Sequence, residues 1–335
     1  MAILKIYDCS NSEERPAHRS SSFCPVTNDI CGDLKEYVQI EKFYQFEYVI
    51  DPVNADVIFT NDIYPQYILD LGKPMVKRMD GIFWQENLQE RNRPYIKAAM
   101  QSSQVIFISK YSLDCFLALS PGFDSFKKTK VILNDAPEWI FNPSPEQFAF
   151  PTITFAACVS NWERKEKRFN SLMEFAKMCN DTWSDEIHIN LIGECNKNLP
   201  SNMTCFGYME TREEIAIILK KSDAFINLSY RDAAPKTVCQ AIRCGLPVLY
   251  ANSGGVGEIV GDFGVPIKDN TIGFEIDEDV YKLKLEDIYH SASQFVVKQI
   301  DIRDKLLEKQ DINTNGFISY KKCLDKYLET FSEVA

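Results

Sequence analysis

Short apolar runs alternate with helical patterns along the whole chain, and this alternation limits the possible fold more than any other feature. The runs are nearly continuous in Val, Ile, Leu and Phe, as is typical of strands buried on both faces of a parallel sheet. They lie at 2–7, 56–60, 104–109, 130–133, 152–159, 186–193, 223–228 and 246–250, and a further strand is expected at 74–76. Strands that alternate with helices indicate βαβ units, so the sequence predicts an α/β fold with doubly wound parallel sheets.

The segments between the runs carry helical signals. Apolar residues recur at i, i+3, i+4 and i+7 over 169–176, and Thr211 with Glu214 matches a capping box. A last helix is expected at about 317–333, where the apolar residues form one stripe. A stripe of that length must be covered by another part of the protein.

The chain is long enough for two domains, because 335 residues correspond to roughly two units of about 150 residues. The segment 135–151 contains four prolines, which interrupt helices and sheets, and the alternating pattern restarts after it. We therefore expect an N-terminal Rossmann-like domain at 1–145, a C-terminal one at 146–315 and a final helix at 316–335. The alternative for 135–151 is an ordinary surface loop.

Charge and composition exclude several classes of protein. Lys and Arg number 37 against 48 Asp and Glu, and the resulting net charge of −11 argues against a nucleic-acid partner. Eleven cysteines without a CxxC pair, with only three histidines, argue against structural zinc and favour reduced thiols. No apolar run approaches the roughly 18 residues that cross a membrane, and the N-terminus does not read as a signal peptide. We therefore expect a cytoplasmic protein without a membrane span.

The segment 229–260 concentrates features that suit an anion. The strand at 223–228 is followed by Asp232 and by a helix with Pro235 at its start, and the strand at 246–250 is followed by a glycine turn. Helix starts thus follow the carboxyl ends of two strands, where backbone N–H groups are unpaired and partly positive. Ligands of open α/β sheets bind at this edge, so the arrangement suits a diphosphate.

A second cluster, 161–168, follows the strand at 152–159 and contains four cations. A charge run of this kind is more often a solvated loop. Its place at the same edge of the sheet favours a role in offsetting phosphate charge.

The segment 229–260 resembles the donor-binding signature of the family 4 glycosyltransferases, which are retaining enzymes with a GT-B fold. That signature has an acid, seven residues, a second acid, a Gly-x-Pro-Val stretch and a Gly-Gly-x-x-Glu turn. The corresponding residues are Asp232, Gln240, Gly245-Leu246-Pro247-Val248, Gly254-Gly255 and Glu258. The resemblance is specific over about 100–335 and looser over 1–100. The sequence is also similar to proteins encoded by large algal viruses.

The resemblance implies two Rossmann-like domains that face a cleft, with the acceptor side in 1–145, the nucleotide-sugar donor side in 146–315 and the last helix packed back on the first domain. It implies that Asp232 contacts hydroxyls of the transferred sugar and that Gln240 contacts the ribose. Gln240 replaces the usual Glu, and a neutral amide binds a diol more weakly than a carboxylate does. The alternative for Gln240 is an amide on the helix surface.

Lys167 matches the lysine with which the family neutralises the leaving diphosphate. The family's arginine position falls on Trp162, so Arg164 or Lys165 would have to take that role. In the first half, Asp80-Gly81 stands where many members have His-Gly, and Asp80 would contact the donor sugar. Its alternative is a turn-forming Asp-Gly pair.

Two further features concern loops. The glycine-rich loop that usually follows the first strand is missing, because 8–31 contains no glycine. The base pocket is expected at 206–209, where Tyr208 either stacks on the base or lies in the interior.

The expected catalytic residues are Asp80, Arg164, Lys167 and Asp232. The expected donor-binding residues are Gly81, Gly207, Tyr208, Met209, Lys236, Thr237, Gln240, Ser253, Gly254 and Gly255. No metal site and no cofactor beyond the donor are expected, because cations and helix N-termini would offset the diphosphate charge.

We predict a retaining, metal-independent glycosyltransferase that moves a hexose from a nucleoside diphosphate sugar to a hydroxyl of a glycan or another acceptor. GDP-mannose is the first expectation for the donor, because mannosyl transfer is frequent in the family that the chain resembles, and a UDP-sugar is the second. The alternatives are a non-catalytic GT-B protein that binds nucleotide sugars and a nucleotide-sugar epimerase of the same fold.

Overall fold

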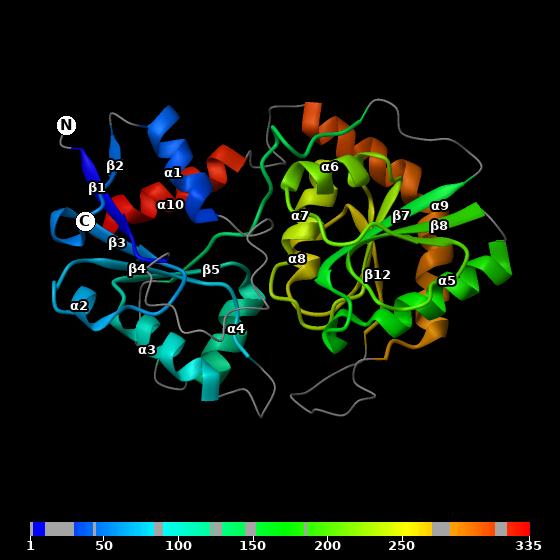
Figure 1. The fold of residues 1–335 in the computed structure, drawn as a ribbon, viewed down its shortest axis with the longest axis horizontal. Coiled ribbons are helices and arrows are strands. Elements are labelled where there is room, and N and C mark those ends of the chain that lie inside the picture. Colours follow the sequence, from blue (N-terminus) through cyan, green and yellow to red (C-terminus); the bar gives the residue numbers. More distant parts are fainter. Residues whose placement is uncertain are drawn as a thin grey trace. The chain divides into compact units, whose positions relative to one another are not determined.

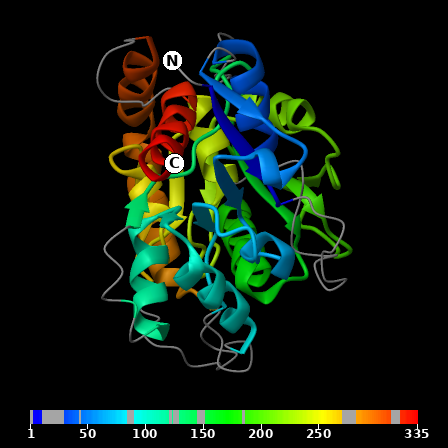
Figure 2. The same cartoon turned by 90° about the vertical axis from the view of Figure 1, so that its left-hand side faces the viewer.

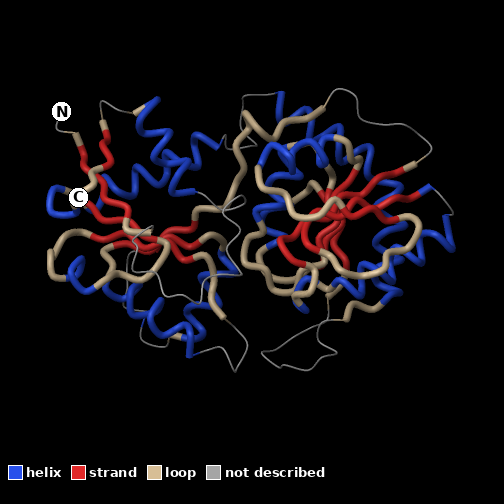
Figure 3. The backbone as a smooth tube through the Cα atoms, viewed as in Figure 1, coloured by secondary structure: helices blue, strands red, loops and turns tan. Residues whose placement is uncertain are grey.

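The protein consists of two compact units, each built on its own six-stranded sheet (Figure 1). A computed structural model describes residues 3–10, 30–42, 45–83, 90–120, 123, 129–144, 152–183, 186–269, 282–311 and 320–335. The first unit comprises Met1–Asn134 with Ser319–Ala335, and the second comprises Asp135–Ile318. In each unit the strands lie between helices (Figure 3), so the predicted α/β fold with two doubly wound parallel sheets is confirmed.

The sheet of the first unit has the order β2-β1-β3-β4-β5-β6, and all its described strand pairs are parallel. Its strands are β1 (Leu4–Asp8), β2 (Phe46–Tyr48), β3 (Val57–Thr60), β4 (Met75–Met79), β5 (Gln104–Phe107) and β6 (Thr129–Val131). Its helices are α1 (Ile30–Glu41), α2 (Gln66–Leu69), α3 (Arg93–Gln101), α4 (Lys110–Leu119) and α10 (Tyr320–Val334), with a 3-10 turn at Pro52–Asn54. The chain leaves β1 for β2 on one side and continues with β3 on the other, which creates a switch point at β1.

The C-terminal helix α10, red in Figures 1 and 2, belongs to the first unit. Its apolar stripe is buried there, against β3 and α1. The stripe consists of Tyr320, Cys323, Leu324, Tyr327, Leu328 and Phe331, as the spacing predicted. Tyr320 Oη donates to Asp33 Oδ2 at 2.5 Å, and Tyr37 Oη donates to Asp325 Oδ1 at 3.0 Å, so polar contacts fix the helix along α1.

The sheet of the second unit has the order β12-β11-β10-β7-β8-β9 and is likewise parallel in its described strand pairs. Its strands are β7 (Ile153–Asn161), β8 (Ile187–Glu194), β9 (Met203–Cys205), β10 (Ala224–Asn227), β11 (Val248–Ala251) and β12 (Gly264–Ile267). Its helices are α5 (Phe169–Trp183), α6 (Arg212–Lys220), α7 (Lys236–Arg243), α8 (Val256–Val260) and α9 (Leu285–Asp311), with a 3-10 turn at Lys165–Lys167. The capping box of Thr211 and Glu214 forms at the start of α6 as predicted.

The boundary between the two compact units falls between Asn134 and Asp135, at the start of the proline-rich segment. A buried ion pair explains this position. Arg243 on α7 donates from Nε to Asp135 Oδ1 at 2.9 Å and from Nη2 to Asp135 Oδ2 at 2.5 Å. Burial favours a lower pKa for Arg243, but Asp135 outweighs it and raises that pKa, so the pair stays charged. The beginning of 135–151 is thereby part of the second unit.

Among the residues that the structure describes, no helix has both the length and the apolar character needed to cross a membrane.

The docking of α10 leads to a first prediction. Phe331 is fully buried, and its ring centroid lies 5.1 Å from that of Phe59. Phe331→Ala should destabilise the first unit by about 3–5 kcal/mol through lost burial and a cavity. Glu329→Ala, an exposed position on the same helix, should change the stability by less than about 0.5 kcal/mol. Calorimetric unfolding measures both variants, and equal losses would contradict the proposed packing role of α10.

Candidate functional site

Three loops of the second unit meet at the carboxyl edge of its sheet. They follow β7, β10 and β11, which are neighbours in the strand order. The loop after β10 holds the other two through backbone hydrogen bonds. Tyr230 N–H donates to Glu166 O at 2.7 Å, Arg231 N–H donates to Ser253 Oγ at 2.9 Å, and Gly255 N–H donates to Asp232 O at 2.9 Å. Segments far apart in sequence are thus fixed as one surface.

Lys167 and Asp232, which the sequence assigned to one site, are in direct contact. Lys167 Nζ donates to Asp232 Oδ2 at 2.9 Å and lies 3.4 Å from Ser229 Oγ. The side chains are 13% and 24% exposed, respectively, so both charges are partly desolvated but still reach the surface. Partial burial strengthens the attraction of Lys167 for an added anion, because water screens it less.

The glycine turn after β11 packs directly against the backbone of Asp232. Gly254 has φ +72°, and a Cβ at this position would lie 2.8 Å from Asp232 N and closer still to Asp232 O. Only glycine allows this close approach. The N–H of Gly255 is already bonded to Asp232 O, and Ser253 Oγ already accepts from Arg231 N–H. The turn therefore supports the Asp232 loop, and the donor-binding role expected of its residues stays a prediction.

Two arginines beside the site, which no sequence pattern indicates, have left-handed backbone conformations. Arg168 (φ 54°) is buried, and its Nη1 pairs with Asp269 Oδ2 at 2.6 Å. Its guanidinium lies 4.8 Å from the ring centroid of Tyr230, and that of Arg231 (φ 50°) lies 5.4 Å from the same ring. Non-glycine residues in this region are strained and concentrate at functional sites. The sequence marked only a run of cations, which does not reveal which member is buried.

Trp162, at the position where the resemblance places an arginine, is a core residue. Its side chain is 5% exposed, its ring packs 5.6 Å from that of Phe169, and its Nε1–H donates to Ile192 O at 3.2 Å. Arg164, the expected substitute, is half-buried and forms an ion pair with Glu166, with Nε 2.7 Å from Oε1. The charge of Arg164 is therefore partly offset within its own loop.

Gln240 lies inside the unit and not on the helix surface, so the surface alternative is wrong. It is 2% exposed, and its Oε1 is buried without a hydrogen-bond partner among the described residues. A buried acceptor without a partner costs about 1–3 kcal/mol, which a ligand hydroxyl would recover by donating to it. Lys236 and Thr237, half-buried, form the first turn of the same helix, directly after Pro235.

The expected base-binding segment lies at the carboxyl end of β9. Gly207 has φ +78°, and its carbonyl accepts from Gly193 N–H at 2.7 Å, which fixes the segment to the end of β8. The neighbouring aromatics Phe206 and Tyr208 are 45% and 40% exposed, so the interior alternative for Tyr208 is wrong. Met209 is half-buried. Exposed aromatic faces at this edge suit stacking with a planar ring.

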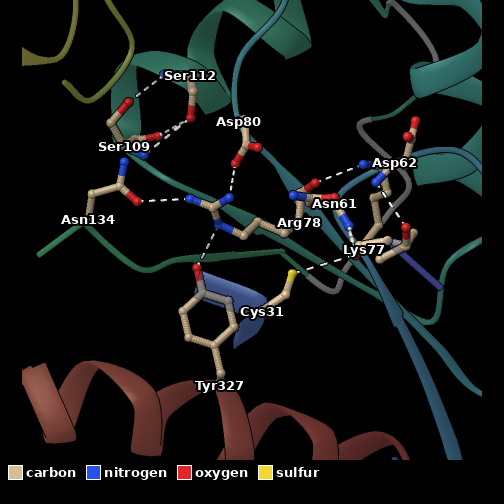
Figure 4. A network of polar contacts seen from close by, with 12 residues as sticks. Cys31, Asn61, Asp62, Lys77, Arg78, Asp80, Ser109, Ser112, Asn134 and Tyr327 are labelled. Atoms are coloured by element: carbon tan, nitrogen blue, oxygen red, sulfur yellow. Dashed lines mark hydrogen bonds and ion pairs between the residues drawn. The ribbon is translucent and has the colours of Figure 1, made fainter. Parts of the chain in front are cut away.

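In the first unit, Asp80 (Figure 4) directly follows β4, and Gly81 comes next in the sequence. Asp80 forms an ion pair with Arg78, and its side chain is 30% exposed while that of Arg78 is fully buried. Burial works to lower the pKa of Arg78, but Asp80 and Tyr327 raise it above its ordinary value. Asp80 is thus a fixed carboxylate, which goes beyond the turn-forming pair considered from the sequence. Gly81 has φ +142°.

Some expectations fall on parts of the chain outside the description. Most of the glycine-free segment 8–31 lies outside the described residues, since these omit 11–29. Within the described ranges, no cluster of His, Cys, Asp and Glu has the composition to hold a metal ion.

Comparison with known proteins bears on the second unit in particular. The family model described as glycosyl transferases group 1 matches residues 159–291, which include Lys167, Asp232 and Gly254. No curated protein sequence matches the chain.

Solved structures are similar to the whole chain in fold. A glycosyltransferase from Rickettsia africae has a TM-score of 0.63 at 14% identity, with 100% of this chain and 99% of that chain covered. The Anabaena protein HepE in complex with UDP-glucose has a TM-score of 0.53 at 15% identity, with coverages of 92% and 99%. The pneumococcal O-GlcNAc transferase GtfA in complex with UDP and GlcNAc has a TM-score of 0.55 at 13% identity, with coverages of 83% and 56%. The fold is that of the GT-B proteins.

The support that Gly254 gives to Asp232 leads to a second prediction. Gly254→Ala should separate Asp232 from Lys167, because the added Cβ overlaps the Asp232 backbone. Gly261→Ala is the matched control: Gly261 also has a positive φ, of 51°, but a Cβ there meets nothing within 4 Å. The control should lose about 1–3 kcal/mol from backbone strain alone, and Gly254→Ala clearly more because steric overlap adds to its strain. Thermal unfolding and the crystal structures of both variants provide the measurement, and an unmoved Asp232 in Gly254→Ala would refute the prediction.

Proposed function

We propose that the protein is a retaining hexosyltransferase that uses a nucleoside diphosphate sugar and transfers the sugar to a hydroxyl of a glycan or another acceptor. The observation that carries this proposal is the contact between Lys167 and Asp232 above the Gly254 turn. A cation for the diphosphate and a carboxylate for the sugar are thereby held 2.9 Å apart at the edge where parallel sheets bind ligands.

Lys167 is the proposed partner of the donor diphosphate. Its side chain is 13% exposed, and its ammonium group donates hydrogen bonds and accepts none, which suits an anion. The helix α7 begins directly after the loop that contains Asp232, and its first turn adds the partial positive charge of a helix N-terminus. We propose that these groups stabilise the leaving diphosphate without a metal ion, with Arg164 as a weaker contributor because Glu166 already pairs with it.

Carboxylates and amides are the proposed partners of the sugar and the ribose. Asp232 retains a second carboxylate oxygen beyond the one bonded to Lys167, and Asp80 is the corresponding fixed carboxylate of the first unit. Gln240 offers its unpaired Oε1 to a ribose hydroxyl. The exposed rings of Phe206 and Tyr208 suit the base.

The proposed mechanism needs no nucleophilic side chain. The protein orients the donor and stabilises the charge that develops on its diphosphate, and an oxygen of that diphosphate takes the proton of the acceptor hydroxyl on the same face of the sugar. The new bond then forms on the face that the diphosphate leaves, which retains the configuration.

GDP-mannose remains the first donor to test, and UDP-sugars are the second. Two proteins of similar fold were crystallised with UDP-glucose or with UDP and GlcNAc, which supports the inclusion of UDP-sugars. Calorimetric titration with GDP, UDP and ADP identifies the base, and tight binding of UDP alone would exclude GDP-mannose.

The ten cysteines that the structure describes are free thiols, which fits the cytoplasmic location that we propose.

A non-catalytic nucleotide-sugar binding protein is the second candidate, favoured by the buried Trp162 at the arginine position. Incubation of the purified protein with donor and acceptor separates the two functions. Transfer supports the enzyme, and tight donor binding without turnover supports the binding protein. Free nucleotide with an epimerised sugar in the absence of acceptor would instead identify an epimerase.

The role of Lys167 gives a third prediction. Lys167→Ala should weaken binding of the nucleoside diphosphate about 10-fold or more, because a charge-assisted hydrogen bond to the phosphate is lost. Lys177→Ala removes an exposed lysine of α5 and should leave the affinity unchanged. Both affinities are measured by calorimetry, and equal affinities would remove Lys167 from the site.

The unpaired oxygen of Gln240 gives a fourth prediction, in which stability and affinity change differently. Gln240→Met keeps the side-chain volume and removes the unpaired acceptor, so the melting temperature should stay equal or rise. Donor affinity should fall about 10-fold, because the ribose loses its partner.

Gln299→Met on α9 is the matched control. Gln299 is 3% exposed, and its Oε1 also lacks a hydrogen-bond partner among the described residues. Gln299 Nε2 also donates to Val296 O at 3.5 Å, so this variant serves as the control for affinity, which should stay unchanged. A Gln240→Met variant with unchanged donor affinity would exclude Gln240 from ribose binding.

A further inference from the structure

Arg78 joins three segments of the first unit that are distant in sequence (Figure 4). It lies on β4 and is fully buried. Its Nε–H donates to Tyr327 Oη on α10 at 3.0 Å, and its Nη2–H donates to Asn134 Oδ1 at 2.9 Å. The remaining nitrogen, Nη1, pairs with Asp80. Each nitrogen of the guanidinium therefore has a different partner.

The planar guanidinium makes these contacts interdependent. Its nitrogens form a rigid fork, so fixing Nε and Nη2 also fixes the direction in which Nη1 points. Tyr327 and Asn134 thus determine where Arg78 presents its charge to Asp80. Because Asp80 is 30% exposed, its position is set from inside the unit while part of its carboxylate reaches the surface.

Burial makes the arrangement sensitive to the loss of either partner. Arg78 is inaccessible to water, so a donor deprived of its acceptor cannot be rescued by solvent and the side chain must shift. The ion pair with Asp80 would shift with it.

Tyr327 has a different hydrogen-bond partner from Tyr320 and Tyr37, the other tyrosines that fix α10. The hydroxyl of Tyr320 bonds to Asp33, and that of Tyr37 bonds to Asp325. All three hydroxyls dock the same helix against the unit, but of the three only that of Tyr327 contacts Arg78. Variants of these tyrosines can therefore distinguish the docking of α10 from the orientation of Asp80.

We infer that Tyr327, with Asn134, is a positioning residue that acts through Arg78 to fix the orientation of the Asp80 carboxylate. This inference rests on the proposed function, in which Asp80 contacts sugar hydroxyls. It gives the C-terminal helix a role in sugar recognition in addition to its role in the core of the first unit.

The test compares the affinity for a nucleotide sugar with that for the corresponding nucleoside diphosphate, which lacks the sugar. The probes are the pair, GDP-mannose with GDP or UDP-glucose with UDP, whose diphosphate binds the wild-type protein. Tyr327→Phe should weaken nucleotide-sugar binding about 10-fold, because a buried hydrogen bond to a charged group is lost, and leave nucleoside diphosphate binding unchanged. Asn134→Ala removes the second partner of Arg78 and should show the same pattern, which keeps the test available if Tyr327→Phe does not fold.

Tyr37→Phe and Tyr320→Phe are the controls. Each removes a tyrosine hydroxyl that docks α10, and each should leave both affinities unchanged even where the melting temperature falls. An equal loss of sugar affinity in all three tyrosine variants would overturn the inference, since docking of the helix alone would then explain it.

Asp80→Asn separates this inference from the function on which it rests. The inference expects Asp80→Asn and Tyr327→Phe to weaken sugar binding selectively. If Asp80→Asn has this effect and both Tyr327→Phe and Asn134→Ala bind like wild type, the inference is overturned and the proposed function stands. A wild-type protein that binds neither nucleotide sugar would overturn the proposed function and the inference with it.

Discussion

The ion pair between Lys167 and Asp232 is the interaction on which the candidate site depends, because it joins the loops after β7 and β10. Its geometry is imposed by the backbone. The parallel strand order brings the loops to one edge of the sheet. The hydrogen bond from Gly255 N–H to Asp232 O fixes the position of the loop after β10 relative to the loop after β11. Two opposite charges that are partly shielded from water attract strongly, so an incoming donor meets a site that is already assembled.

Buried arginines that pair with aspartates hold loops in place in both units. Arg78, Arg168 and Arg243 each pair with an aspartate, and for Arg168 and Arg243 that partner comes from a segment about 100 residues away in sequence. A buried pair of this kind is weak evidence for stability, since desolvation offsets much of the attraction. Its effect lies in geometry, because an arginine fork accepts its partners in few orientations. These pairs fix the positions of loop ends, which apolar packing alone would not determine.

The residue types of the resemblance did not reveal which contacts each side chain makes. The match places Trp162 at a cation position, yet its ring lies in the core. Arg231, next to Asp232 in the sequence, has a strained backbone that no motif predicted. Gln240 is buried on α7, and its amide oxygen has no hydrogen-bond partner among the described residues. The departures concentrate where the chain would meet a ligand, and this is where local sequence rules are expected to fail.

The sequence by itself determined the α/β alternation, the stripe of α10 and the segments that meet at the carboxyl edge, because these follow from periodicity and from the polarity of parallel strands. Only the tertiary structure decided which charges face one another. Nothing local in a run of cations tells that Arg164 turns to Glu166 and Lys167 to Asp232, or that Tyr327 reaches Arg78. Such pairings depend on the strand order and on burial, which are properties of the whole unit and not of any short segment.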